Sequence, residues 1–181
     1  MIRMKIVFFC CFVALLAPIS ALALNVGDKL PTFVGQDLNG KTVDLNTIVG
    51  KKPIMLVFWS TWCDDCKEKL PEINEMVKKY SDNGLEFIGI NIGMKDTEKK
   101  ARAYVKEKKM TYPNVFDKTG KLSEKYQLNK VFALIVAAKD GTIMMRFNNI
   151  PEFGDETLEI LKTYVHPEGK KSVADEGKPK K

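Results

Sequence analysis

The sequence predicts an α/β fold in which a central mixed β-sheet is flanked by helices and preceded by an N-terminal β-hairpin. Apolar runs rich in β-branched and aromatic residues alternate with amphipathic segments, as expected for a sheet covered by helices. Two turns, Asn39-Gly40 and Asp140-Gly141, each lie between short runs that favour strands and therefore predict hairpins. The chain has 181 residues, 45% apolar and 29% charged, which fits one folded domain.

The first predicted elements are a hairpin and a buried strand. Residues 30–45 carry the Asn39-Gly40 turn between two alternating runs. After a break at 50–53, residues 54–59 form a continuous apolar run. Such a run is typical of a strand covered on both faces, so we expect it at the centre of the sheet.

A long amphipathic helix is predicted to begin at Cys63. Its apolar residues recur at helical spacing with charged residues opposite, and Asn83-Gly84 marks a stop. Pro71 lies inside this helix and is expected to kink it. Residues 85–92 then predict a second buried strand.

The C-terminal half of the domain completes the sheet and its cover. Asp96 or Thr97 can cap a helix that runs to about Lys108. Residues 134–147 predict a second hairpin around Asp140-Gly141, and residues 156–165 a last helix. The order of these elements implies helices on both faces of the sheet.

The N-terminal residues are predicted to direct export. Arg3 and Lys5 precede an apolar stretch, and small residues end it at Ala23, which is typical of a secretory signal peptide cleaved there. The alternative is a retained membrane anchor formed by residues 6–24, which carry no charge. Both interpretations predict a periplasmic or otherwise exported protein.

The remaining chain divides into a folded domain, residues 24–166, and a basic tail, residues 167–181. The tail is polar and poor in apolar residues, so we expect it to be disordered. The net charge of +6 is otherwise diluted along the chain, without basic residues interleaved with aromatics on a folded face. A nucleic-acid partner is therefore not expected.

Two cysteines carry the predicted chemistry. Cys10 and Cys11 lie in the export segment, which leaves Cys63 and Cys66 for the exported domain. A Cys-x-x-Cys at a helix start places both sulfurs on one face, and we expect the first to be exposed where the helix dipole favours a thiolate. The first sulfur can then attack a disulfide and the second can resolve the product.

Blander interpretations of the dithiol also remain open. The pair could form an inert disulfide, although so short a loop removes little chain entropy. A metal within one chain would need two more ligands, and the single histidine, His166, lies beside the tail; an intermolecular metal is the remaining alternative. Lys67 stands where a c-type haem attachment needs histidine. We therefore expect neither metal nor cofactor beyond the Cys63–Cys66 disulfide itself.

Residues 26–165 resemble the thioredoxin superfamily, and more closely its exported TlpA/ResA-type thiol-disulfide oxidoreductases, in the redoxin or AhpC/TSA-like region. The resemblance rests on these motifs: the segment 26–33, the turn 39–41, Phe58-Trp59-Ser60-Thr61-Trp62-Cys63-x-x-Cys66-Lys67, Leu70-Pro71 and the turn 139–142. It implies a thioredoxin fold, Cys63 as nucleophile and Cys66 as resolving thiol. It also implies partners among exported protein thiols and disulfides, including apocytochromes, and an inner-membrane electron donor.

This chain departs from the family pattern around the dithiol. Asp64 and Asp65 occupy the positions between the sulfurs, where the family often has a proline. Phe132 occupies the cis-proline position, so we expect a trans bond after Val131 and a reshaped loop for the partner's backbone. Trp62, Val131 and Phe132 are the predicted substrate-binding residues.

Two further departures concern proton transfer. Lys69 stands where some members carry a glutamate, and Val57 stands where classical thioredoxins carry a buried aspartate. We therefore expect slow exchange at neutral pH, with protons supplied by solvent or another group.

Two other functions are compatible with such a fold. A binding module would keep a resting disulfide and dock a partner without exchange; restoring proline at position 132 would then leave it unchanged, whereas an enzyme would gain turnover. A thiol peroxidase is the weaker alternative, because Leu56 and Ser60 replace the proline and threonine of the peroxidatic motif.

Overall fold

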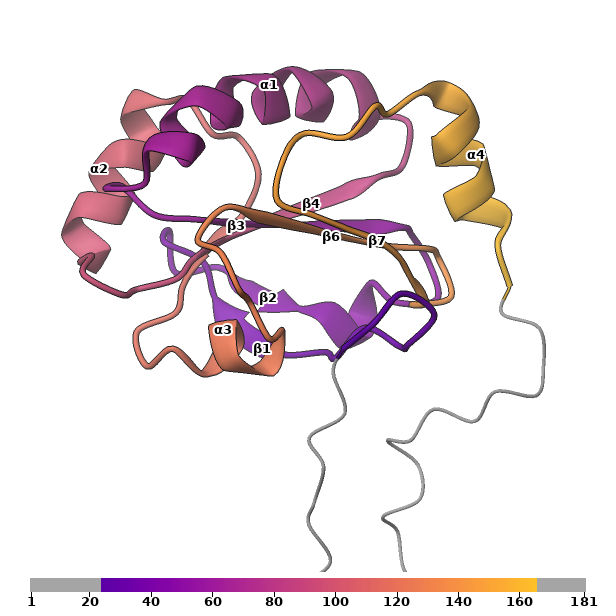
Figure 1. The fold of residues 1–181 in the computed structure, drawn as a ribbon, viewed down its shortest axis with the longest axis horizontal. Helices are drawn as coiled ribbons and strands as arrows, with labels where there is room; N and C mark the ends of the chain where they lie inside the picture. Colours follow the sequence, from indigo (N-terminus) through magenta and orange to yellow (C-terminus); the bar gives the residue numbers. More distant parts are fainter. Residues whose placement is uncertain (1–23, 166–181) are drawn as a thin grey trace, which may run out of the picture.

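The computed structural model describes residues 24–165, which form a five-stranded mixed sheet between two layers (Figure 1). In sheet order the strands are β5 (Asn114–Phe116), β4 (Glu86–Asn91), β3 (Ile54–Trp59), β6 (Ala133–Ala137) and β7 (Ile143–Phe147). Strand β4 runs parallel to β3 and β5, whereas β6 is antiparallel to β3 and β7. The predicted mixed sheet is confirmed, with residues 54–59 as its central strand.

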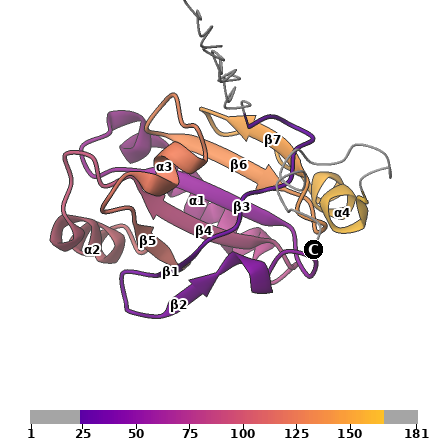
Figure 2. The same ribbon diagram turned by 90° about the horizontal axis from the view of Figure 1, so that it is seen from below.

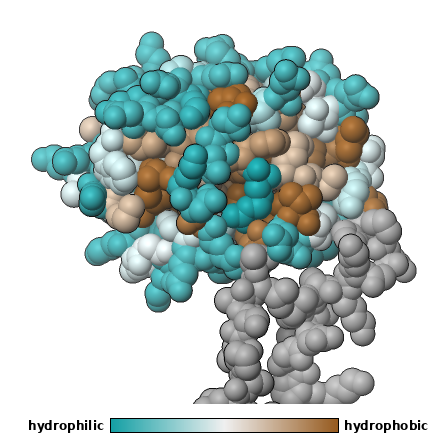
Figure 3. All heavy atoms as spheres, in the orientation of Figure 1, coloured by the Kyte–Doolittle hydropathy of each residue, from teal (hydrophilic) through white to brown (hydrophobic). Residues whose placement is uncertain are grey.

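Helices α1 (Asp64–Tyr80), α2 (Glu98–Glu107) and α4 (Asp155–Thr163) contribute to the core on one face of the sheet. The opposite face is covered by the hairpin β1–β2 (Val34–Gln36 and Thr42–Asp44), a 3-10 helix (Leu45–Thr47) and the short helix α3 (Lys121–Lys125) (Figure 2). Figure 3 shows hydrophilic side chains over the outer helical layer and hydrophobic patches nearer the level of the sheet. Both faces are therefore buried, as the apolar run of β3 predicts.

Strand β3 supplies side chains alternately to the two cores. Met55, Val57 and Trp59 pack in the core beneath α1. The intervening side chains pack under the hairpin and α3: Ile54, Leu56 and Phe58. All six residues of β3 are buried, and the chain passes from the carboxyl end of this strand to the start of α1.

Three elements are absent from the sequence-based prediction, one of which is the 3-10 helix Leu45–Thr47. Strand β5 has only three residues and follows Pro113, so it carries too short a pattern to be recognised. Helix α3 has five residues, none of them buried, and therefore no apolar stripe. The predicted helices and both predicted hairpins are present. Pro71 lies inside α1. Thr97, not Asp96, caps α2.

Several predictions fall outside residues 24–165. They concern the signal peptide or anchor, Cys10 and Cys11, His166 and the basic tail. Between residues 24 and 165, no helix combines the length and apolar character needed to cross a bilayer.

Candidate active site

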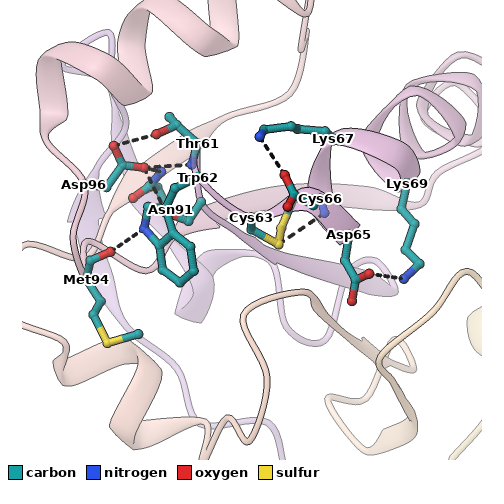
Figure 4. The surroundings of a disulfide bond; sticks show 12 residues. Thr61, Trp62, Cys63, Asp65, Cys66, Lys67, Lys69, Asn91, Met94 and Asp96 are labelled. Atoms are coloured by element: carbon teal, nitrogen blue, oxygen red, sulfur yellow. Dashed lines mark hydrogen bonds and ion pairs between the residues drawn. A yellow bond between two sulfur atoms is a disulfide. The ribbon is translucent and has the colours of Figure 1, made fainter.

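Cys63 and Cys66 lie where the central strand passes into helix α1 (Figure 4). Cys63 is the N-cap of α1, and its Sγ accepts a hydrogen bond from the Cys66 backbone N–H at 3.1 Å. The two sulfurs are joined in a disulfide. An N–H group directed at Sγ at a helix N-terminus is an arrangement that stabilises negative charge on that sulfur after reduction.

The two cysteines differ in accessibility, but both are buried. Cys63 is 7% exposed and Cys66 is 0% exposed. The expectation of an exposed first sulfur is therefore wrong in degree, because the surrounding side chains cover most of Cys63. Of the two residues, Cys63 is nevertheless the one that solvent can reach.

The two carboxylates between the cysteines point into solvent and are paired with lysines. The Lys67 Nζ lies 2.7 Å from Asp64 Oδ1, and the Lys69 Nζ lies 3.5 Å from Asp65 Oδ1. The hydrogen bond from Lys67 lowers the pKa of Asp64 below its usual range. Water and these lysines screen the negative field that the two aspartates exert on the sulfurs.

A carboxylate from a separate loop organises the segment before Cys63. Asp96 accepts hydrogen bonds from the Thr61 N–H at 2.8 Å, from the Ser60 and Thr61 hydroxyls at 3.0 Å, from the Asn91 side-chain amide at 2.9 Å and from the Thr97 N–H at 2.9 Å. Burial alone would raise the pKa of Asp96, but these hydrogen bonds outweigh it and the pKa lies below its usual value.

This role of Asp96 is not indicated by the sequence, in which the residue stands out only as a possible helix cap. Its partners come from the end of β3, the end of β4 and the start of α2. The signal that could have found it was the adjacent Thr97, because a second capping residue leaves the first carboxylate free for another use.

Trp62 and Met94 lie together beside the dithiol. The Trp62 Nε1–H donates to the Met94 carbonyl oxygen at 2.7 Å, and the two residues are 37% and 54% exposed. Trp59, in contrast, is fully buried, stacks on Tyr104 and donates its Nε1–H to Asn114 Oδ1 at 3.0 Å. Trp62 is therefore placed on the surface next to Cys63, whereas Trp59 is placed in the core.

The segment before β6 carries the other two predicted substrate-binding residues. Val131 is half-buried, and Phe132 is 1% exposed within the same hydrophobic cluster as Cys63 and Cys66. Residues 24–165 contain no cis peptide bond, so the bond between Val131 and Phe132 is trans as expected. The Phe132 side chain belongs to the core, which leaves Asn129, Lys130 and part of Val131 as the accessible side chains of this segment.

A cleft of about 770 Å³ opens next to this segment. Its walls come from the loops after β4 and β5, from α3 and from the segment before β6, and its lining includes Met94 and Val131. Val57, at the position where classical thioredoxins carry a buried aspartate, is fully buried. Within residues 24–165, no group of three or more His, Cys, Asp or Glu side chains is placed to hold a metal ion.

Comparisons with known proteins agree with this geometry. A profile of the AhpC/TSA family matches residues 26–146. A thiol-disulfide oxidoreductase ResA of Bacillus cereus is 30% identical over 142 residues, which cover 78% of each chain.

Solved structures share the fold at lower identity. A thiol:disulfide interchange protein of the thioredoxin family from Chlorobium tepidum has a TM-score of 0.61 at 21% identity, covering 69% of this chain and 88% of its own. A secreted disulfide oxidoreductase of Mycobacterium tuberculosis has a TM-score of 0.58 at 23% identity, covering 71% of this chain and 91% of its own. The chain belongs to the AhpC/TSA family and, within the thioredoxin superfamily, to the TlpA/ResA-like thiol-disulfide oxidoreductases.

Proposed function

We propose that this protein is an exported thiol-disulfide oxidoreductase that reduces disulfides of partner proteins with its Cys63–Cys66 dithiol. The observation that carries the proposal is the pair of cysteines at the start of α1, with Cys63 at the cap and Cys66 fully buried behind it. This asymmetry gives the two thiols different tasks.

The reaction is a two-step thiol-disulfide exchange. The Cys63 thiolate attacks one sulfur of the partner's disulfide, forms a mixed disulfide and displaces the partner's other sulfur as a thiolate. The Cys66 thiolate then attacks Cys63 Sγ, which forms the Cys63–Cys66 disulfide and releases the partner's second thiolate. Two electrons pass from the dithiol to the partner, whose thiolates take up the two protons that the dithiol lost.

Partner docking is proposed to use Trp62, Val131 and the backbone at Phe132. Trp62 and Val131 offer accessible apolar surface, and the cleft that Val131 lines leaves room for an extended chain. The proposed partners are exported proteins with disulfides, including apocytochromes. An inner-membrane electron donor would return the disulfide to the dithiol.

Export is supported by the signal-like residues 1–23. The M. tuberculosis protein of the same fold is described as secreted, which is compatible with this location. The mass of the protein isolated from its membrane and soluble fractions would distinguish cleavage after Ala23 from an anchor retained at residues 6–24.

The proposal is tested by equilibrating the mature protein in dithiothreitol redox buffers and trapping its thiols by alkylation. A reversible transition of the Cys63–Cys66 pair at a low potential is expected, together with insulin reduction that Cys63→Ser abolishes. Cys66→Ser should instead accumulate a mixed disulfide with the partner. A pair that stays oxidised in every buffer would sink the proposal.

A binding module with a resting disulfide is the second candidate. The observation that favours it is the low accessibility of the site, since Cys63 is 7% exposed and Phe132 fills the core beside it. Phe132→Pro distinguishes the two functions: the kcat for insulin, measured separately from the KM, should rise in a reductase, whereas a pure binding module would show no turnover before or after the change.

A further inference from the structure

The Lys69 ammonium lies between helix α1 and the segment before β6. Its Nζ is 5.3 Å from the centre of the Phe132 ring and 3.5 Å from Asp65 Oδ1. A cation at this distance from an aromatic face is attracted by the negative charge of the π system. The Lys69 side chain is 24% exposed, so this attraction is only partly screened by water.

The two partners of Lys69 belong to the two parts of the site. Asp65 lies between the cysteines in the first turn of α1, where Figure 4 shows Lys69 reaching toward it. Phe132 is the last residue before β6 and packs in the same cluster as both cysteines. A single ammonium therefore contacts both the dithiol turn and the segment opposite it.

The segment needs such a contact because little else in it is buried. Asn129 and Lys130 are exposed and Val131 is half-buried, so Phe132 is the residue that anchors it. The pair with Asp65 contributes little by itself, since that carboxylate is 59% exposed. The contact with the buried ring is the part of the Asp65–Lys69–Phe132 cluster that can determine where the segment lies.

We propose that Lys69 is a positioning residue that holds segment 129–132 against the dithiol turn, so that the extended backbone of a protein partner docks beside Cys63. This inference rests on the proposed reductase function. It explains what two departures from the family pattern do together: the lysine and the phenylalanine form one contact.

The proposal predicts a defect confined to protein substrates. Lys69→Met keeps an apolar stem on the ring but removes the charge, and should raise the KM for insulin about three- to tenfold with little change in kcat. Lys69→Arg should restore the KM, because its guanidinium also stacks on aromatic rings. Reduction of a small uncharged disulfide, bis(2-hydroxyethyl) disulfide, should change much less than the KM for insulin, because it needs no docked backbone.

Two controls separate positioning from general stability. Lys78→Met, at the exposed far end of the same helix, should leave the KM unchanged. In a Phe132→Leu background, which keeps apolar bulk without a ring, Lys69→Met should have no further effect. An unchanged insulin KM in Lys69→Met, or an equal loss with the small disulfide, would overturn the proposal.

Amide hydrogen exchange gives a readout that does not depend on activity. Residues 129–133 should exchange faster in Lys69→Met than in the wild type and Lys69→Arg, while the core strand β3 stays protected. Equal exchange in all three proteins would overturn the positioning role. If the wild-type protein reduced neither disulfide, the reductase function would fail, and exchange alone would still test the contact.

Discussion

On one side of the dithiol, residues 60–61 are held by hydrogen bonds to the carboxylate of Asp96, whereas on the other side residues 129–132 are held by the burial of the Phe132 ring. The first side depends on a charged group and therefore on pH. The second depends on packing and on a cation over a ring. We therefore expect that residues 60–61 and residues 129–132, the two walls of the site, can be destabilised separately. Loss of a carboxylate should affect the first wall, and loss of a buried ring should affect the second.

The largest effect is expected from Phe132→Ala. Removing a fully buried ring should lower the free energy of unfolding by about 3–5 kcal/mol, because the lost burial is added to the cost of a cavity. Urea unfolding would measure it. Val131→Ala, at the half-buried neighbour, is the control and should cost clearly less; equal costs would show that the ring does not anchor this side.

A smaller loss is expected from Asp96→Ala. The change removes the acceptor of the Thr61 and Thr97 N–H groups and of the buried Asn91 amide, so stability should fall by about 1.5–3 kcal/mol. Asp82→Asn, at an exposed position, is the control and should change little. The amide of Thr61 should also exchange its hydrogen faster in Asp96→Ala than in the wild type, with both proteins in the dithiol form. Equal exchange at Thr61 would contradict the role assigned to Asp96.

The two walls should also differ in their response to acid. Because the pKa of Asp96 is lower in the folded protein than in the unfolded chain, its contribution is fully present above a pH of about 4 and is lost as the pH falls through the folded-state value. Unfolding at pH 6 and pH 3 should show a smaller acid loss in Asp96→Asn than in the wild type. Phe132→Leu should lose as much stability in acid as the wild type does, and the opposite ranking would break the comparison.

The smallest effect on stability is expected from Trp62→Phe. It removes the hydrogen bond to the Met94 carbonyl but keeps an aromatic surface, so the loss should be about 0.5–1 kcal/mol at this half-exposed position. A thermal unfolding scan would detect the shift. A loss as large as that of Asp96→Ala would mean that Trp62 supports the dithiol loop as well as its surface.

Much of the framework could be predicted from the sequence because it depends on local patterns. Strand β3 is a continuous apolar run, helix α1 follows a Cys-x-x-Cys, and both hairpins carry glycines at positive φ in their turns, 82° at Gly40 and 84° at Gly141. The dithiol itself could be recognised for the same reason.

The parts that escaped prediction depend on contacts between distant segments. The bonds from Asp96 to Ser60 and Thr61 join residues 36 and 35 positions apart, and no local pattern indicates them. The contact between Lys69 and Phe132 likewise joins a helix to a remote segment, the one before β6. An exposed Cys63 was expected from its position in the sequence, but its burial depends on the side chains that surround it in three dimensions.

The Cys66 N–H already donates to Cys63 Sγ at 3.1 Å, so the two residues do not have to find each other after a partner has been captured. In the proposed reaction, the second thiol thus acts at a high effective concentration, which no change in the amount of protein can alter. The lifetime of the mixed disulfide with a partner would then be set by how fast Cys66, in the first turn of α1, attacks Cys63. A partner whose disulfide needs longer to rearrange would be released as soon as Cys66 reacts, whether or not its correct pairing had been reached.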